Sequence, residues 1–187
     1  MKLERPQKQR TTLWNSTRKN TDADATSAPR EGAGKTEGGV MPSVNHPPTI
    51  LIIDDNSADV FLLRRGLDQL GEAYQLEILA DGAAALQFVD EHRTGVREPN
   101  PCVILLDLQL PEHKGLEVLR AIKREPVLAH IKVVVMTSFA SPKEEAKIRS
   151  MGAFCCVKPG PKSASGYNEL AAEVLEICKG APQPGLV

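Results

Sequence analysis

Residues 50–55 read Ile-Leu-Ile-Ile-Asp-Asp, and residues 102–107 read Cys-Val-Ile-Leu-Leu-Asp. Each stretch is a short apolar run that ends in one or two carboxylates. A run without alternation of polar and apolar residues is typical of a strand buried on both faces, as in a parallel sheet. Similar runs occur at residues 76–79 (LEIL), 133–136 (VVVM) and 154–157 (FCCV). The sequence therefore predicts five buried strands.

Segments with helical periodicity lie between and after these runs. Residues 57–70 repeat apolar residues at helical spacing, with Ser57 as a candidate N-cap and Gly71 at the end. Residues 141–144 (SPKE) have the form of a capping box with proline at the first helical position. Further helical patterns follow Asp81, Gly115 and Gly166.

Alternation of strands and helices predicts an α/β domain over residues 49–180, with a doubly wound five-stranded parallel sheet and helices on both faces. The flavodoxin-like strand order 2-1-3-4-5 is the common solution for a domain of this size. In that order the first and third strands are neighbours, and ligands bind beyond their carboxyl ends.

Residues 1–48 differ in composition from the rest of the chain, because they contain few large apolar residues and show no periodicity. Such a segment buries too little apolar surface to offset the entropy lost on ordering, so we expect a disordered N-terminal tail. Met41 is an alternative start that would still include the domain, and residues 181–187 form a short C-terminal tail.

The 187-residue chain has a net charge of −1, which divides into +3 for residues 1–47 and −4 for the remainder. This balance predicts neither nucleic acid nor a membrane surface as a partner. No apolar run is long enough to span a bilayer. The four cysteines lack both C-x-x-C spacing and the density of a disulfide framework, and no secretory signal is present, so we expect a cytoplasmic protein.

Polar or charged residues follow four of the five predicted strands, at Asp54-Asp55, Asp107, Thr137-Ser138 and Lys158-Pro159. Three carboxylates at one sheet edge repel one another unless cations are present. One lysine and one divalent cation would neutralise them, and oxygen ligands favour Mg²⁺ or Mn²⁺. Asp107 could then attack a phosphoryl group as a nucleophile, while Thr137 and Lys158 stabilise the phosphoryl oxygens.

The ordered motifs LIIDDN, ILLDLQLP, VVVMTS and VKP over residues 49–180 resemble a response-regulator receiver domain of two-component phosphorelay signalling. The resemblance implies that Asp107 accepts phosphate from a sensor histidine kinase or a histidine phosphotransfer protein. It also implies a magnesium site formed by Asp54, Asp55, Asp107 and the backbone carbonyl of Gln109. Thr137 would reorient toward the phosphoryl group, and Lys158 would pair with Asp107 and then with the phosphate.

The resemblance also implies a switch region that contains Ser138, Cys155 and Pro159. Cys155 stands where many receivers have an aromatic switch residue, so the usual coupling between threonine and an aromatic ring is not expected. The stretch around residues 110–138 is most similar to stand-alone regulators that partner bacterial phytochromes. Such a protein signals through contact with a downstream protein or through onward phosphotransfer, as a monomer or a phosphorylation-dependent dimer.

Other functions on this fold fit the sequence less well. A constitutive receiver-like protein-binding module would have lost the acceptor, a metal-site acid or the lysine, and all are present. An aspartyl-phosphate hydrolase of the haloacid dehalogenase kind needs an aspartate two residues after the nucleophile, where Gln109 stands. A flavin phosphate would be repelled by Asp54-Asp55. We therefore expect a phosphoacceptor switch and not an enzyme.

Overall fold

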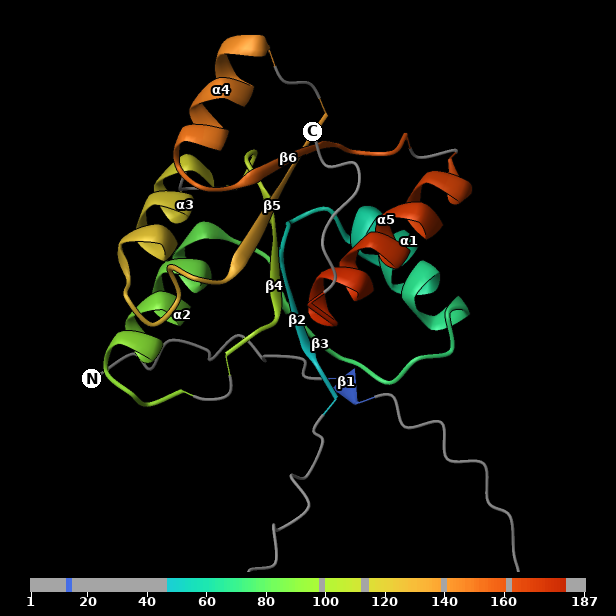
Figure 1. Cartoon of the computed structure of the whole chain (residues 1–187), viewed down its shortest axis with the longest axis horizontal. Coiled ribbons are helices and arrows are strands. Elements are labelled where there is room, and N and C mark those ends of the chain that lie inside the picture. The colour runs from blue at the N-terminus through green and yellow to red at the C-terminus, as the bar shows by residue number, and fades with distance from the viewer. Residues whose placement is uncertain are drawn as a thin grey trace, which may run out of the picture.

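The structure is a computed structural model, and it describes residues 13–14, 47–97, 100–111, 115–138, 141–160 and 163–180. Within these residues, six strands form one sheet and five helices flank it (Figure 1). The strands are β1 (Leu13–Trp14), β2 (Thr49–Ile53), β3 (Gln75–Leu79), β4 (Val103–Asp107), β5 (Lys132–Thr137) and β6 (Phe154–Val157). The helices are α1 (Ser57–Gln69), α2 (Gly82–Arg93), α3 (Gly115–Arg124), α4 (Pro142–Ser150) and α5 (Ala164–Cys178).

Strands β2 to β6 are all parallel and lie in the order β3-β2-β4-β5-β6. This is the predicted order 2-1-3-4-5, so the doubly wound flavodoxin-like fold is confirmed. Each of the five strands begins and ends within one residue of its predicted apolar run. The pattern was informative because a central strand such as β4, which is buried at every position, needs apolar residues toward both faces.

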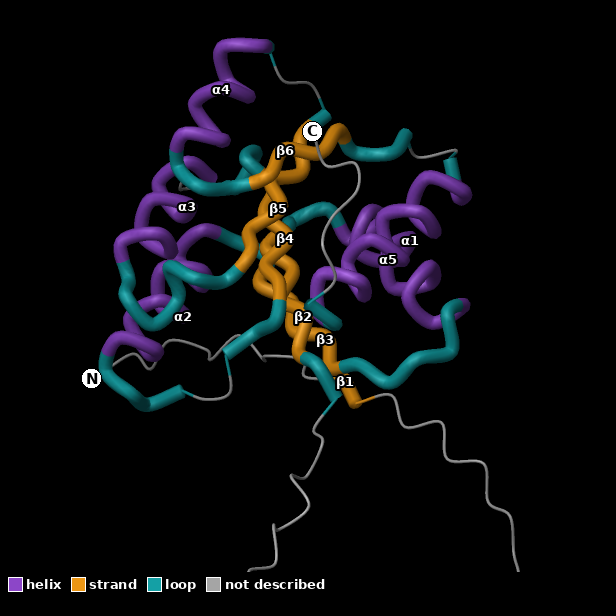
Figure 2. The backbone as a smooth tube through the Cα atoms, viewed as in Figure 1, coloured by secondary structure: helices purple, strands orange, loops and turns teal. Residues whose placement is uncertain are grey.

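Helices cover both faces of the sheet, with α1 and α5 on one side and α2, α3 and α4 on the other (Figure 2). Successive residues of β2 point to opposite faces. Leu51 and Ile53 join the core under α2, α3 and α4, whereas Ile50 and Ile52 join the core under α1 and α5. The sheet is therefore the shared wall of two hydrophobic cores.

The helix termini follow the capping chemistry in the sequence, with one correction. Asn56 is the N-cap of α1 and accepts a hydrogen bond from the Ala58 N–H, so the prediction of Ser57 was wrong by one residue. Asparagine caps as well as serine does, and sequence alone does not separate adjacent candidates. The capping box of α4 is confirmed, because Ser141 and Glu144 cap each other's backbone groups and Pro142 stands at the first helical position.

Strand β1 was not predicted, since it lies in the segment expected to be a disordered tail. It pairs antiparallel with β3, Leu13 opposite Leu76 and Trp14 opposite Gln75, and adds a sixth strand to the five parallel ones. An edge strand offers unpaired N–H and C=O groups to any extended segment that reaches it. Otherwise, residues 1–46 and 181–187 lie outside the described residues. No helix in the described parts of the chain is long and apolar enough to cross a membrane.

A disulfide joins Cys102, just before β4, to Cys178, the last residue of α5, with Cα atoms 5.0 Å apart. The cysteine pattern predicted no disulfide framework, and this single bond was not predicted. The two cysteines are 76 residues apart in the sequence and meet only because α5 packs across the sheet. Cys155 and Cys156 are free, and as neighbours on β6 they face opposite cores.

Reduction of the Cys102–Cys178 bond is expected to lower the free energy of unfolding by about 2–4 kcal/mol, because the bond restricts a long loop in the unfolded chain. Guanidinium unfolding with and without dithiothreitol measures this difference. The double variant Cys102→Ser/Cys178→Ser should not respond to the reductant, whereas the control Cys156→Ser should respond as the wild type does. Equal unfolding midpoints for the oxidised and reduced wild type would contradict the prediction.

Candidate functional site

The carboxyl edge of the sheet gathers the charged residues that the sequence placed after the strands. Asp54 follows β2, Asp107 ends β4, Thr137 ends β5 and Lys158 follows β6. The Lys158 N–H donates to the Thr137 carbonyl at 2.8 Å, which extends the pairing of β5 and β6 by one step. This bond holds the lysine backbone at the edge where the acids lie, as predicted from the parallel arrangement.

Three carboxylates come together at this edge. Oxygens of Asp54, Asp55 and Asp107 all lie within 4.8 Å of one another. Asp54 and Asp107 are buried, whereas Asp55 is exposed. The Asn56 N–H donates to Oδ1 of Asp54 at 2.8 Å, and the Gln109 N–H donates to Oδ1 of Asp107 at 3.0 Å. Converging carboxylate oxygens with one open side are the donor set that suits Mg²⁺ or Mn²⁺.

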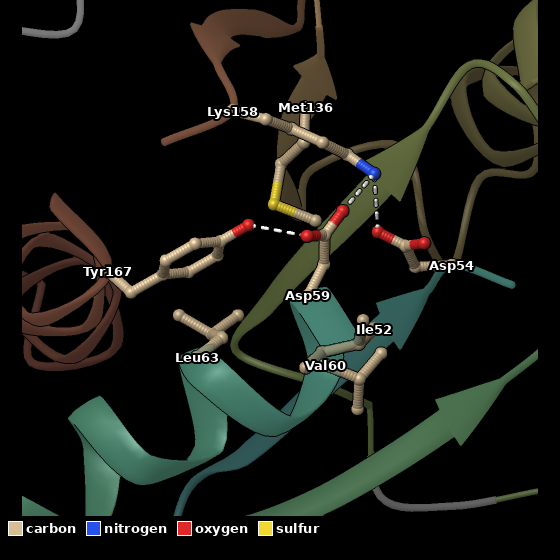
Figure 3. A pocket seen from close by; sticks show the side chains of 8 residues that line it. All are labelled: Ile52, Asp54, Asp59, Val60, Leu63, Met136, Lys158 and Tyr167. Carbon is tan, nitrogen blue, oxygen red and sulfur yellow. Dashed lines mark hydrogen bonds and ion pairs between the residues drawn. The ribbon is translucent and has the colours of Figure 1, made fainter. Parts of the chain in front are cut away.

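Lys158 occupies the inner side of this cluster. Its ammonium group donates to Oδ2 of Asp107 at 2.7 Å and to Oδ2 of Asp54 at 2.9 Å. It also donates to Oδ2 of Asp59, on α1, at 3.0 Å (Figure 3). The lysine side chain is only 9% exposed, so these three ion pairs are weakly screened by solvent.

Burial and pairing shift the protonation equilibria of this cluster. Burial raises the pKa of the Asp54 carboxyl, although the hydrogen bonds from Lys158 and Asn56 act in the opposite direction. Burial alone would lower the pKa of Lys158, but its hydrogen bonds to Asp107, Asp54 and Asp59 outweigh this effect and raise the pKa. Lys158 therefore stays protonated throughout the neutral range.

The sequence model of the response regulator receiver domain matches residues 50–163, which is more than half of the chain. The chain belongs to the response regulator receiver domain family. The resemblance inferred from the four motifs is thus confirmed at the level of the family.

Known relatives are response regulators, and one similar solved structure is that of a phytochrome response regulator. Response regulator Rcp1 of Synechocystis sp. is 42% identical over 94 residues, which are 50% of this chain and 64% of Rcp1, so less than two thirds of that relative is covered. The Mn²⁺-bound structure of Rcp1 superposes with a TM-score of 0.63 at 29% identity, over 74% of this chain and 100% of that one. The phosphorylated cyanobacterial phytochrome response regulator RcpA also gives 0.63, at 25% identity, over 75% of this chain and 100% of that one.

Two residues at the receiver site were not predicted, namely Asp59 and Tyr167. Asp59 lies in the first turn of α1, and Tyr167 lies in the first turn of α5. The Tyr167 hydroxyl donates to Oδ1 of Asp59 at 2.7 Å, and the Asn56 side-chain amide donates to Oδ2 at 3.0 Å. Burial and the bond to Asp59 together raise the pKa of the Tyr167 hydroxyl, so it remains a hydrogen-bond donor.

A signal for Asp59 was present in the sequence. Asp59 is four residues after Asp55. The first turn of a helix that begins directly after a site residue stays close to that site, so an acidic residue there is a candidate. No comparable local signal marked Tyr167, because it is 108 residues away from Asp59 in the sequence.

The predicted switch residues lie around the lysine. Ser138 is exposed after β5, and Cys155 is half-buried on the face of β6 that packs toward α4. Burial raises the pKa of the Cys155 thiol, with a smaller contribution from Glu145 on α4, so this cysteine is a protonated, partly buried apolar group. Pro159 lies against the first turn of α5, so close to Gly166 that a Cβ there would be 2.8 Å from it.

A pocket of about 300 Å³ opens beside the exposed side of the acidic cluster. Its walls come from β2, α1 and the end of β3, and it is lined by Asp54, Asp55, Ser57, Val60, Phe61, Arg64, Ile78 and Ala80. Two members of the acidic cluster, Asp54 and Asp55, thus border this pocket.

Gly115, the first residue of α3, closes the backbone turn that follows Asp107. Its N–H donates to the Leu108 carbonyl at 3.0 Å. A Cβ at this position would be 2.4 Å from the Asp107 carbonyl oxygen and 2.5 Å from the Leu108 Cα. Both are backbone atoms, which cannot move without displacing Asp107 itself. Glycine is therefore needed here for close approach of two backbone segments.

Gly115→Ala is expected to destabilise the fold by about 1–3 kcal/mol, because the added methyl group overlaps the backbone of residues 107–108. Chemical denaturation measures the loss. Gly160→Ala is the matched control, since a Cβ at Gly160 would have nothing within 4 Å. A Gly115→Ala variant as stable as Gly160→Ala would show that the close approach is not a constraint.

Proposed function

We propose that the chain is a response regulator that accepts a phosphoryl group on Asp107, within a receiver domain over residues 49–180. The observation that carries the proposal is the contact of 2.7 Å between Oδ2 of Asp107 and the Lys158 ammonium, beside two further carboxylates. The phosphodonor is a phosphohistidine on a sensor histidine kinase or a histidine phosphotransfer protein. The similarity to the phytochrome response regulator RcpA favours a phytochrome-type sensor kinase, and the receiver family favours a cytoplasmic location.

In the transfer step, a carboxylate oxygen of Asp107 forms a bond to phosphorus. The bond between phosphorus and the histidine nitrogen breaks, and its electron pair stays with the imidazole, which then takes up a proton from solvent. The product is an acyl phosphate on Asp107. Lys158 would offset charge on the phosphoryl oxygens, and the hydroxyl of Thr137, which ends the neighbouring strand β5, would donate to one of them.

Asp54, Asp55, Asp107 and the backbone carbonyl of Gln109 are the groups we propose for a divalent cation. Bound there, Mg²⁺ or Mn²⁺ would offset the negative charge of the carboxylates and of an incoming phosphoryl group. Asp54 and Asp107 each present one carboxylate oxygen that a backbone N–H already orients. Their preorganisation lowers the cost of ordering ligands when the ion binds.

The phosphorylated protein would signal through a change in the shape of its surface and not through turnover of a substrate. Movement of Thr137 toward the phosphoryl group would reach Ser138, Cys155 and Pro159, which adjoin β5, β6 and α5. A downstream protein, or a second copy of the chain, would then read the α4–β6–α5 side. The alternative function, a constitutive protein-binding module, differs from this one because Asp107 would not become labelled.

Incubation with acetyl phosphate and Mg²⁺ should add one phosphoryl group to the wild-type chain, and Asp107→Asn should add none. Intact-mass spectrometry measures the added mass. The label should be lost in hydroxylamine, which cleaves acyl phosphates. A label that persists in Asp107→Asn would rule out Asp107 as the acceptor, and an unlabelled wild type would favour the constitutive module.

Mg²⁺ is expected to raise the melting temperature, because an ion that binds only the folded chain stabilises it. Asp55→Asn should weaken the affinity for Mg²⁺ by about tenfold or more, because one charged ligand is removed. Asp55 is exposed, so this variant should fold normally without the ion. Asp90→Asn is the control, since Asp90 is exposed and pairs with Arg93 outside the cluster. An unchanged affinity in Asp55→Asn would contradict the assignment of this ligand.

A further inference from the structure

Lys158 has no hydrogen-bond donor left for a new partner. An ammonium group has three N–H donors and no acceptor. In this structure they meet three different carboxylates, those of Asp107, Asp54 and Asp59. A phosphoryl group on Asp107 adds oxygens that also need the lysine, so one of the present acceptors must give up its bond.

Of the two acceptors that do not themselves carry the phosphoryl group, Asp59 is better able than Asp54 to release the lysine. Its Oδ1 receives the Tyr167 hydroxyl at 2.7 Å, and its Oδ2 receives the Asn56 side-chain amide at 3.0 Å. Both bonds are independent of Lys158, so the carboxylate would remain hydrogen-bonded after the lysine leaves. Asp59 is also partly exposed, at 13% of its side chain, whereas the Asp54 side chain is fully buried. A charge with some access to water costs less to leave without its cation.

We propose that Asp59 is a positioning residue for the phosphoacceptor reaction. Asp59 competes with the phosphoryl group for Lys158, and Tyr167 holds Asp59 in place. The inference rests on the proposed function of Asp107. In the resting state Asp59 draws the ammonium toward α1 (Figure 3). Phosphorylation transfers the lysine to the phosphoryl oxygens, and Asp59 then relies on Tyr167 and Asn56 alone.

This exchange connects the site to α5. Tyr167 is buried, with 2% of its surface exposed, and lies where α1 and α5 pack closely together. A Cβ at Gly66 of α1 would be 2.9 Å from the Tyr167 carbonyl oxygen, so the two helix backbones are in near contact. A change in the Asp59–Tyr167 bond therefore acts on the first turn of α5.

Substitutions of Asp59 and of Tyr167 are expected to change the rate at which Asp107 is labelled in opposite directions. Asp59→Asn keeps the size and one acceptor oxygen, replaces the other oxygen with an NH2 donor and removes the competing charge, so acetyl phosphate with saturating Mg²⁺ should label Asp107 about three- to tenfold faster. Tyr167→Phe removes a donor from Asp59 and leaves its charge more dependent on Lys158, so labelling should be about two- to fivefold slower. Because Tyr167 acts through the charge of Asp59, the double variant should label as fast as Asp59→Asn.

Tyr74→Phe is the matched control. Tyr74 is also buried in the core under α1 and α5, and its hydroxyl also donates to an aspartate of α1, Asp68, at 2.5 Å. Neither residue contacts Lys158 through any bond described above, so this variant should label at the wild-type rate. Melting temperatures of all variants identify any general loss of stability.

The labelling rates of the variants test this inference separately from the proposed function. A wild type that is labelled on Asp107, with Asp59→Asn and Tyr167→Phe both slower or both unchanged, would overturn the inference and leave the function intact. No labelling of any chain would overturn the function and the inference together. Affinity for beryllofluoride, an unreactive mimic of the phosphoryl group, should follow the same order as the rates, and the reverse order would also overturn the inference.

Discussion

The ammonium group of Lys158 and the carboxylates around it cannot be buried separately. A charged lysine that is 9% exposed has lost most of its hydration, which costs several kcal/mol unless anions replace the water. Asp54 and Asp107 have the opposite difficulty, since two buried carboxylates close to one another repel. The lysine and the carboxylates each lower the free-energy cost of burying the other. The carboxyl edge of the sheet is organised around these ion pairs.

The strand order makes this pairing geometrically possible. β4 lies between β2 and β5, so Asp54 and Asp107 end neighbouring strands, and Lys158 enters from β6 on the far side of β5. The lysine backbone stays bonded to Thr137 while its long side chain reaches across the end of β5 to the two acids. A different strand order would separate these groups. The two hydrophobic cores therefore support the site indirectly, because they determine which strand ends are adjacent.

The parts of this structure that could be predicted from sequence are those with a local signal. Buried strands are recognisable in the sequence as apolar runs. Such a run precedes each of four site residues, namely Asp54, Asp107, Thr137 and Lys158. The parts that were missed depend on side chains that meet across the fold. Tyr167 and Asp59 are 108 residues apart, and Cys102 and Cys178 are 76 residues apart. Their pairing is determined by how α5 packs on α1 and on the sheet, and strand order alone does not specify the position of a helix along its own axis.

Asp59 changes the charge balance of the site. Three carboxylates, one lysine and one divalent cation would sum to zero, but the structure adds a fourth carboxylate to the same lysine. Its other donors, the Tyr167 hydroxyl and the Asn56 amide, are neutral. Any added anion at Asp107 must therefore redistribute the bonds of Lys158, and the structure offers α5 as the element that responds. The last residue of α5 is tied to the start of β4 by the disulfide, while Tyr167 lies in its first turn. The end of α5 is thus held by a covalent bond, whereas its first turn carries the hydroxyl that bonds to Asp59.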